Sequence, residues 1–484
     1  MGRTLAFPRR RLALLLGAVL AVGLVVGFAL EHHGRPPLAP GRGPESDPLA
    51  YKGDRGDDTM LETRAAAGLS HVLYAKSPGG ATATAARTAR FRPLIDATAA
   101  RYRLDPNTLE GIVFLESAGR PEARAGNDLA GAVGLTQILA QTGSGLLHMH
   151  VDLARSRKIT KQLRKAIAKH KTKLAARLRA QRRQADQRFD PAKSLDGTGR
   201  YLTFAKPLLG GRDDLAVESY HMGVGNLQSV LRAYGGSAAS TSYAQLYFGS
   251  TPLRHSSAYA RLAAFGDDSA TYLWRVLAAK EIMRLYRQDP AELSRLQALH
   301  ADKATAEEVL HPRSTTRVYA TPADVASARA SGQLRPLPAN AADLHLQVDK
   351  GMGSLAGKLH RKRTLYRALQ PDALAVLIYL AAGVHEISGE SSLTVTSTVR
   401  DERYQRLLIA RNIQATQKYS LHTTGFAFDI LRRYRSKRQA VAFQFMLDRL
   451  TALDLIAWAP EPSAIHITVS SDARVLLPLL AKVK

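Results

Sequence analysis

Glu116 lies near the end of a predicted helix, on the face that carries the apolar residues. Asp105-Pro106 is typical of a helix start, with aspartate as the N-cap and proline in the first turn. Leu109, Ile112 and Val113 precede Glu116 at the spacing of one helical stripe. We expect Gly119-Arg120-Pro121 to end this helix. An apolar setting and the negative end of the helix dipole both favour the neutral acid, so Glu116 is suited to donate a proton. The alternative is a glutamate that faces water in a frayed last turn.

A second group of chemically capable residues lies near the C-terminus. His422 precedes Asp429 by seven residues, and Gly425 lets the chain turn before a predicted strand at 426–430. With His466 on the last predicted strand, these residues form a His-Asp-His set that leaves a fourth zinc position for water. The alternative is a histidine-containing α+β core without metal.

Three polar residues upstream of this set could bind a carboxylate. They are Ser397, Arg400 and Gln405. The guanidinium of arginine can hold a C-terminal carboxylate in a forked, two-bond geometry. We therefore interpret them as a substrate-binding element.

Composition limits the classes of protein. With 484 residues, the chain is long enough for two to three domains. It has 68 Lys and Arg against 41 Asp and Glu, a formal net charge of +27, which suits an anionic partner: nucleic acid, a membrane surface or an acidic wall polymer. The absence of cysteine excludes disulfides and thiolate metal sites.

The N-terminus has the pattern of a membrane anchor. Arg9, Arg10 and Arg11 precede an uncharged apolar stretch at 12–30, longer than a usual signal-peptide core and without a good cleavage site. The arginines keep the N-terminus in the cytoplasm and the remaining chain outside, so we expect a single-pass protein of the cell membrane. The alternative is a cleaved signal and a secreted protein. Residues 31–60 are rich in proline and glycine and are expected to be a flexible linker.

Residues 61–290 have mainly helical patterns, with a basic insertion at 150–188. Between 155 and 188 there are fourteen Lys and Arg and one acid, Asp186. The apolar residues recur at helical spacing, which predicts an amphipathic helix or helical hairpin. These residues are Ile159, Leu163, Ile167, Leu174 and Leu178. We expect this segment to bind an anionic wall polymer or membrane surface; the alternative is an ordinary solvated helix face.

A connector at 291–345 precedes a smaller predicted domain at 346–484. Its helices are expected at 371–387, 400–411 and 437–452, and its strands at 392–397, 426–430 and 465–469. Helices and strands alternate without a repeating βαβ unit, so the fold class is α+β.

Four ordered blocks resemble the soluble lytic transglycosylase (SLT) family, over about 90–290. They are Glu116-Ser117-Ala118-Gly119-Arg120-Pro121, Gly131-Ala132-Val133-Gly134-Leu135-Thr136-Gln137, Ser219-Tyr220-His221-Met222-Gly223-Val224-Gly225-Asn226 and Asp268-Ser269-Ala270-Thr271-Tyr272. The resemblance implies a mainly α, lysozyme-like fold and cleavage of the MurNAc-GlcNAc β-1,4 bond of peptidoglycan, with a 1,6-anhydro product and no cofactor.

The resemblance also implies roles for single residues. Glu116 is the catalytic acid and base, Ser117 orients its carboxyl, and Gln137 lines the glycan cleft. Tyr220 and Tyr272 lie near the carboxyl. His221 stands where the family usually has asparagine, so the substrate contact there is altered. Hydrolysis, as in a muramidase, is the alternative, with Asp128 as a second acid.

Residues of about 370–470 resemble the LAS-type zinc D-alanyl-D-alanine carboxypeptidases. The Ser420 to Asp429 block and the later His466 match the pattern in which His422, Asp429 and His466 bind zinc. The family's catalytic glutamate position holds Ser463, and Glu461 is nearby. This domain is therefore expected to bind stem peptides, and cleavage of them depends on another base.

Together these features predict a membrane-anchored enzyme of peptidoglycan, with a transmembrane helix, a lysozyme-like domain and a smaller LAS-peptidase-like domain. Zinc is expected only in the C-terminal domain. The alternative is a wall-binding protein with degenerate active sites. Nucleic-acid binding rests on charge alone, because the chain has no recognised nucleic-acid module, so we expect no nucleic-acid partner.

Overall fold

The structure is a computed structural model that describes residues 38–53, 55–302, 306–411 and 419–482. The predicted transmembrane segment 12–30 lies outside these residues. Within them, the helix Pro371–Ser388 is long and apolar enough to cross a membrane, but 72% of it is buried inside the protein. It is therefore the core helix of a folded domain.

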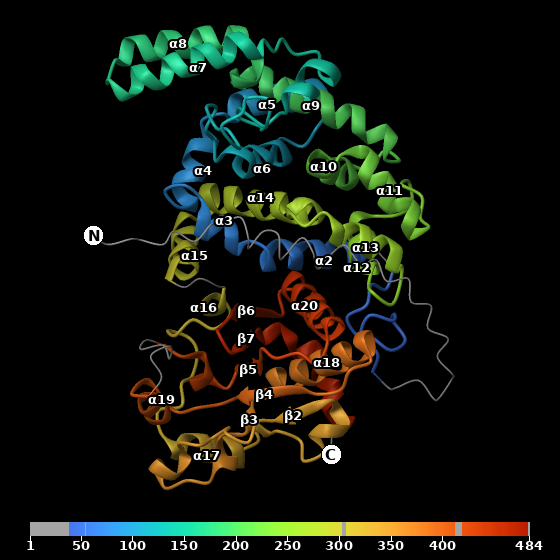
Figure 1. The fold of residues 1–484 in the computed structure, drawn as a ribbon, viewed down its shortest axis with the longest axis vertical. Coiled ribbons are helices and arrows are strands. Elements are labelled where there is room, and N and C mark those ends of the chain that lie inside the picture. Colours follow the sequence, from blue (N-terminus) through green and yellow to red (C-terminus); the bar gives the residue numbers. More distant parts are fainter. Residues whose placement is uncertain (1–37, 54, 303–305, 412–418, 483–484) are drawn as a thin grey trace, which may run out of the picture. The chain divides into compact units, whose positions relative to one another are not determined.

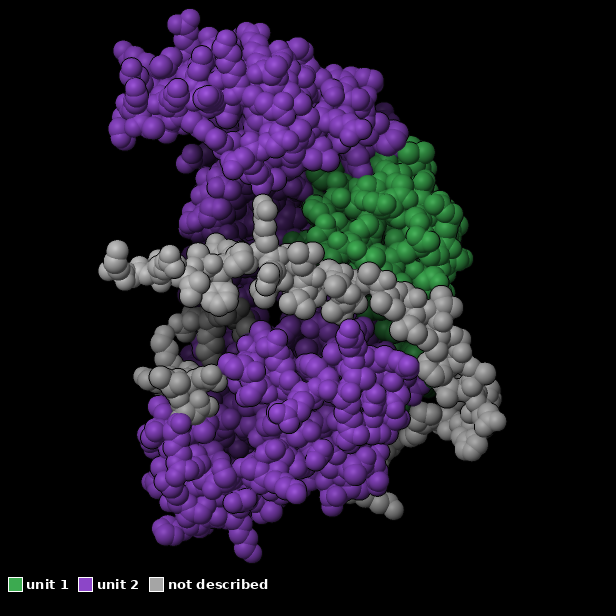
Figure 2. Space-filling view, in the orientation of Figure 1, with its two compact units in different colours: residues 1–58, 205–273 green, residues 59–204, 274–484 purple. Residues whose placement is uncertain are grey.

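The chain divides into two compact units (Figure 2). The first unit contains residues 1–58 and 205–273, and the second unit contains residues 59–204 and 274–484. Residues of the predicted helical domain 61–290 therefore belong to both units.

Helices form nearly all of the regular structure up to residue 302 (Figure 1), consistent with a lysozyme-like helical domain. In chain order they are α2 (Arg55–Gly68), α3 (His71–Lys76), α4 (Ala81–Ala89), α5 (Arg92–Tyr102), α6 (Pro106–Ser117), α7 (Leu153–Ala168), α8 (Thr172–Ala185), α9 (Pro191–Leu208), α10 (Asp213–Met222), α11 (Val224–Tyr234), α12 (Tyr243–Gly249), α13 (Ser256–Ala264), α14 (Tyr272–Gln288) and α15 (Pro290–Asp302).

The helix that carries Glu116 is α6, and it begins as the sequence predicts. The Asp105 carboxylate accepts hydrogen bonds from the N–H groups of Asn107 and Thr108 at 3.0 and 3.2 Å. These bonds satisfy donors that a helix start leaves without partners. The helix ends at Ala118, which has a left-handed φ of 54°, one residue before the predicted glycine.

Two contacts fix α6 within the second unit. Gly111 lets α14 approach closely, because an added Cβ would lie 2.9 Å from the carbonyl oxygen of Val276. The fully buried Glu110 forms ion pairs with Arg92 at 3.2 Å and Arg287 at 2.7 Å. A buried carboxylate requires such partners, so these pairs bind α6 to α5 and α14.

The basic insertion folds as a helical hairpin of α7 and α8 (Figure 1). Ile159, Leu163 and Leu178 are buried between the two helices. The prediction that Ile167 and Leu174 share this stripe is wrong: they are 48% and 43% exposed. At this level of the hairpin the buried stripe continues through Ala166 and Ala175, so Ile167 and Leu174 lie one position to the side of it.

The described part of the predicted linker, 38–53, packs as turns instead of forming a loose tether. Asp47 is 4% exposed, and its carboxylate accepts hydrogen bonds from the N–H groups of Gly41 and Leu49 at 2.8 and 2.9 Å. Thr251 donates a hydrogen bond of 2.5 Å to the Gly41 carbonyl. A buried capping aspartate of this kind is hard to distinguish from a loop residue by composition alone.

Two sheets lie in the C-terminal part of the second unit. The strands are β1 (Arg335–Pro336), β2 (Leu346–Val348), β3 (Ala368–Leu369), β4 (Leu393–Ser397), β5 (Ala427–Leu431), β6 (Ile456–Pro460) and β7 (Ala464–Val469). Strands β1 and β3 pair with each other, and the larger sheet has the order β2-β4-β5-β7-β6, with only the β2–β4 pair parallel. Helices α18 (Pro371–Ser388) and α20 (Lys437–Ala452) pack on each other and on this sheet. This architecture agrees with the α+β prediction, although only β4, β5 and β7 were predicted, and β1, β2, β3 and β6 were not.

The predicted connector 291–345 has two different environments. Its first part, α15, packs against α3 and α4, whereas α16 (Glu307–Leu310) packs against β6 and β7. The Tyr319 N–H donates to the Thr423 carbonyl at 2.8 Å. The segment also contains α17 (Pro322–Ala330), so much of it is part of the C-terminal fold.

Candidate functional site

Glu116 lies in the last turn of α6 and is partly buried, while Leu109, Ile112 and Val113 of its stripe are fully buried. The next residue, Ser117, is 1% exposed. Its hydroxyl donates to the Val113 carbonyl at 3.2 Å and accepts from the Arg120 N–H at 3.3 Å. These bonds give Ser117 a role in ending the helix beside the carboxyl.

Gln137 is held in a strained backbone conformation, with φ of 51°. Its side-chain amide donates to the Gly134 carbonyl at 2.8 Å. Gly134 has φ of 85°, and an added Cβ would lie 1.8 Å from the Arg188 carbonyl oxygen. The loop backbone therefore fixes where the Gln137 side chain lies.

Arg188 organises this loop, and the sequence analysis did not identify it. It is fully buried, forms an ion pair with Asp186 at 2.8 Å, and donates to the carbonyls of Leu129, Gly131 and Ile138 at 2.7, 3.1 and 3.2 Å. The sequence does contain a signal for this ion pair, because Asp186 is the one acid in a strongly basic stretch. Such an acid often has a specific partner.

Asp128, the candidate second acid, is 67% exposed and has two partners. Its carboxylate accepts from the Ala130 N–H at 3.0 Å and from Arg157 on α7 at 2.8 Å. Both hydrogen bonds lower the pKa of Asp128, and the bond from the Ala130 N–H has the larger effect. The contacts stabilise the loop and its junction with the hairpin.

Tyr220, His221 and Tyr272 lie together in the first unit. The Tyr220 and Tyr272 rings are 6.1 Å apart, and the His221 and Tyr272 rings are 5.3 Å apart. His221 Nδ1 lies 2.9 Å from the Ser269 hydroxyl. The third and fourth sequence blocks therefore meet. Glu116, Ser117 and Gln137 belong to the second unit, and the approach of the two tyrosines to the carboxyl stays a prediction.

The Tyr272 backbone is supported by Glu218 on α10. The Glu218 carboxylate is fully buried and accepts a hydrogen bond from the Leu273 N–H at 2.8 Å. Burial raises the pKa of Glu218 to about 8, so the group is mostly neutral at pH 7.

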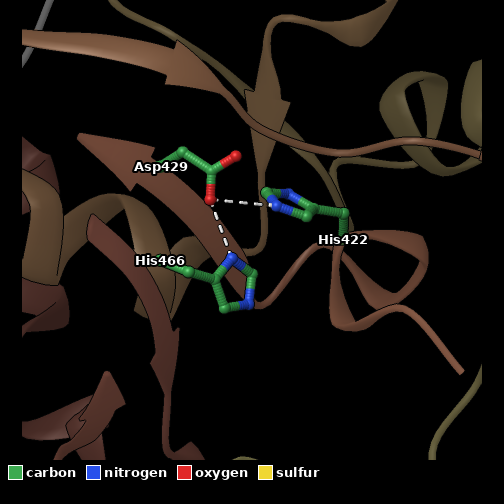
Figure 3. Close-up of side chains that lie close together, drawn as sticks. All are labelled: His422, Asp429 and His466. Carbon is green, nitrogen blue, oxygen red and sulfur yellow. Dashed lines mark hydrogen bonds and ion pairs between the residues drawn. The ribbon is translucent and has the colours of Figure 1, made fainter. Parts of the chain in front are cut away.

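The C-terminal set His422, Asp429 and His466 comes together as predicted from the sequence (Figure 3). Asp429 Oδ1 lies 3.2 Å from His422 Nε2 and 2.7 Å from His466 Nδ1. One ligand atom from each residue lies within 4.8 Å of the others. Asp429 and His466 are direct cross-strand partners on β5 and β7, so their side chains project from the same face.

The outer nitrogen of each imidazole also has a partner. His422 Nδ1 lies 2.9 Å from the Thr398 carbonyl, and His466 Nε2 lies 3.1 Å from the Glu307 carboxylate. Both outer partners are acceptors, so an N–H at each outer nitrogen would be satisfied and would leave each inner nitrogen with a lone pair for a metal ion. This arrangement fits a divalent metal ion. Glu307 was not identified from the sequence, because no spacing rule connects the short helix α16 with β7.

Charges inside the centre shift the titration of these groups. Burial, with the Arg400 guanidinium, lowers the pKa of His422 to about 4. Burial alone would raise the pKa of Asp429, but His422 and His466 hold it well below its usual value. Burial alone would lower the pKa of His466, but Glu307 and Asp429 raise it. Asp429 is therefore an anion, as a metal ligand must be.

Arg400 lies beside this set, and the other two predicted binding residues hold its guanidinium. It donates to Ser397 at 2.6 Å and to Gln405 at 3.1 Å, and it forms an ion pair with Asp429 at 3.4 Å. Arg400 precedes α19 (Glu402–Ile409) instead of starting it, because Asp401 is the N-cap. The predicted helix 400–411 is therefore shorter at both ends.

These groups line a cavity of about 550 Å³ in the second unit. Its acidic lining residues are Glu307, Asp429 and Glu461. Ser463, at the position where the family has glutamate, also lines it. Glu307 is bound to His466 and Asp429 lies between the histidines, so Glu461 is the exposed acid at this cavity.

Residues 93–242 match the family model described as Transglycosylase SLT domain. The match includes Glu116, Gln137 and Tyr220 and ends before Tyr272. It supports a lytic transglycosylase that acts on peptidoglycan. No curated protein matches the chain significantly.

Replacing Glu218 with glutamine should change how stability depends on pH. The pKa of this carboxyl rises from 4.5 to about 8 on folding. Its contribution to stability is therefore fully present below about pH 4.5 and is lost as the pH rises through about 8. Because glutamine does not titrate, Glu218→Gln should gain stability over the wild type by a few kcal/mol between about pH 5 and 9, measured by urea unfolding.

The exposed variant Glu281→Gln is the control and should show no comparable trend. Parallel pH profiles for the wild type and Glu218→Gln would contradict the assignment of a neutral buried acid.

Proposed function

We propose that the protein is a peptidoglycan lytic transglycosylase that uses Glu116 as its single acid and base. The observation that carries this proposal is the family match over 93–242, which includes Glu116 at the end of a helix whose stripe is otherwise buried. A partly buried carboxyl at the C-terminal end of a helix is suited to remain protonated until the glycan bond is cleaved.

The reaction needs one carboxyl group. Glu116 first donates its proton to the oxygen of the MurNAc-GlcNAc β-1,4 bond, and the bond to C1 breaks. The resulting carboxylate then accepts the proton of the muramic acid C6 hydroxyl, whose oxygen forms the new bond to C1. The product is a 1,6-anhydro sugar, no water is consumed and no cofactor is needed. Gln137, Tyr220, His221 and Tyr272 are proposed to hold the glycan, with Ser117 supporting the carboxyl from the helix end.

The contacts of Asp128 favour this reaction over hydrolysis. A hydrolytic muramidase needs a second carboxylate to activate water or to act as nucleophile. The Asp128 carboxylate is engaged by the Ala130 N–H and by Arg157, which are loop-stabilising partners.

Mass spectrometry of sacculi digested by residues 31–484 tests this function. Wild-type muropeptides should be one water lighter than hydrolytic products. Glu116→Gln should lower the rate at least about 10²-fold, because glutamine cannot transfer the proton. Asp128→Asn, the matched control, should keep both the product mass and most of the rate.

Products of full hydrolytic mass that disappear in Asp128→Asn would instead show a muramidase. Binding to sacculi without any cleavage would favour a wall-binding protein with degenerate sites.

We also propose that the C-terminal domain resembles LAS-type peptidases in binding zinc and a peptidoglycan stem peptide. The observation that favours this function is the buried His422, Asp429 and His466 set, with both inner nitrogens directed at one carboxylate. A zinc ion held there would act as a Lewis acid toward a peptide carbonyl and lower the pKa of a water molecule. Arg400, oriented by Ser397 and Gln405, would bind the peptide's carboxylate.

Ser463 has no carboxylate that could accept a proton, so we propose Glu461 as the general base of peptide cleavage. Both residues line the cavity, and of its three acids Glu461 alone is exposed and outside the contacts between Asp429, Glu307 and the histidines. Its carboxylate would accept the proton of the attacking water.

Metal analysis and stem-peptide digestion test the second site. Wild-type residues 31–484 should carry about one zinc ion, and His422→Ala should lose it. Glu461→Gln should keep the zinc and lose peptide cleavage at least about 10²-fold. Zinc binding without cleavage by the wild type would make the domain a binding module, and a wild type without zinc would favour a metal-free core.

We propose that the α7–α8 hairpin holds the enzyme on an anionic membrane surface. Its exposed basic residues are Arg155, Arg157, Lys158, Lys161, Arg164, Lys165, Lys169, Lys171, Lys173 and Arg177. The exposed Ile167 and Leu174 lie at its tip, flanked by lysines. An acidic wall polymer would require only the charge, whereas exposed apolar side chains among lysines favour a lipid surface. The predicted anchor at 12–30, with the catalytic domains outside the cytoplasm, would keep the hairpin near that surface.

Binding of residues 31–484 to lipid vesicles tests this partner. The double variant Ile167→Ser/Leu174→Ser should bind phosphatidylglycerol vesicles about tenfold more weakly, because two apolar contacts are lost. Val441→Ser, at another exposed apolar residue, is the control and should bind normally. Unchanged vesicle binding by the double variant, with salt-sensitive binding to sacculi, would assign the hairpin to the wall polymer.

A further inference from the structure

A buried carboxylate from outside the C-terminal sequence motif contacts the candidate metal centre. Glu307 is the first residue of α16 and is 5% exposed. Its Oε1 lies 3.1 Å from His466 Nε2 and accepts a hydrogen bond of 3.3 Å from the buried Thr468 hydroxyl. The carboxylate therefore has two partners on β7, and the helix that carries it lies about 160 residues earlier in the sequence.

The segment that carries Glu307 is held along β7 at a second point. His311 Nε2 donates a hydrogen bond of 2.5 Å to the Val469 carbonyl, and its ring stacks on Phe426 at 4.0 Å. The Tyr419 hydroxyl donates a hydrogen bond of 3.1 Å to the backbone carbonyl of His311. Because both ends of the segment 307–311 are attached to the sheet, the position of the Glu307 carboxylate is well determined.

His466 has a carboxylate on each side of its ring, Asp429 at Nδ1 (2.7 Å) and Glu307 at Nε2 (3.1 Å). A carboxylate accepts hydrogen bonds, so without a metal ion either nitrogen can hold the proton of a neutral imidazole. A cation bound at Nδ1 removes this choice, because Nδ1 then supplies its lone pair to the cation and Nε2 carries the proton, which Glu307 accepts. The Glu307 contact therefore favours the tautomer that leaves Nδ1 available to a cation.

His422 shows the same arrangement with a different outer partner. Its Nδ1 is directed at the Thr398 carbonyl at 2.9 Å, and its Nε2 is directed at Asp429. The outer partner of His422 is neutral backbone, whereas that of His466 is a charged side chain that can be replaced by mutation. His466 is therefore the ligand at which the effect of an outer partner can be measured.

We propose that Glu307 is a positioning residue of the metal centre, which fixes the Nε2–H tautomer and the ring orientation of His466. This inference rests on the proposed zinc site. It makes the site a product of two distant segments, because the β5–β7 sheet supplies the ligands and α16 supplies the group that orients one of them. Outer partners of this kind contribute about 10- to 100-fold to metal affinity.

Zinc affinity of the full-length protein, measured by competition with a chelator, tests the proposal. Glu307→Ala should weaken zinc binding about 10- to 100-fold, whereas Glu307→Gln should restore most of it, because the amide oxygen still accepts from Nε2–H. Glu308→Ala is the matched control: it removes a neighbouring buried acid of the same helix and should bind zinc as the wild type does.

A second measurement separates positioning from loss of structure. The ring ¹⁵N shifts of labelled His466 should show the Nε2–H tautomer in the wild type and in Glu307→Gln, and a mixture of tautomers in Glu307→Ala. Glycan cleavage by the same samples reports whether the chain is folded. Equal zinc affinity and an unchanged tautomer in Glu307→Ala would overturn the role of Glu307 and leave the proposed zinc site intact. A wild type that binds no zinc would overturn the proposed zinc site itself.

Discussion

The C-terminal domain depends on the concentration of charge around Asp429. This buried carboxylate has an imidazole nitrogen on each of two sides and the Arg400 guanidinium on a third. An isolated buried charge is unfavourable, so each partner compensates part of the cost of burying it. The sheet order β4-β5-β7 places Arg400 and Ser397 at the end of one strand and His466 on another, with Asp429 between them. The fold therefore provides the electrostatic balance before any ligand binds.

The helical part of the chain also pairs its buried charges, but there the pairs fix the position of the backbone. Glu110, buried on α6, is paired with Arg92 and Arg287, and the buried Arg188 pairs with Asp186 while binding three carbonyls of the loop that leads to Gln137. Neither pair contains a residue that we propose to be catalytic. Both fix the backbone on which Glu116 and Gln137 lie, so their function is to limit how far these side chains can move.

Local signals in the sequence predicted local structure well. Three such features are found as expected: the Asp105 cap, the α20 helix at 437–452, and the contact between His422 and Asp429, which lie seven residues apart. Each depends on residues within about ten positions of one another. Contacts between distant segments were not predictable in this way. Glu307 reaches His466 only through tertiary packing. Ile167 is exposed because the buried stripe of the hairpin runs through its neighbour Ala166 instead. A hydrophobic pattern shows which residues share a face, but it does not show how far the covering element extends.

The two proposed sites differ in what their chemistry requires of the chain. In the glycan reaction the nucleophile is a hydroxyl of the substrate itself, held next to C1 by the sugar ring, so one carboxyl can serve as acid and then as base. In peptide cleavage the nucleophile is water, which must be both bound and deprotonated, so a metal centre without a separate base is incomplete. This difference explains why one carboxyl, Glu116, is sufficient for the proposed glycan reaction, whereas serine at position 463 is a serious departure. It also makes Glu461, at the cavity beside Ser463, the residue of the C-terminal domain on which the proposed peptide cleavage would depend.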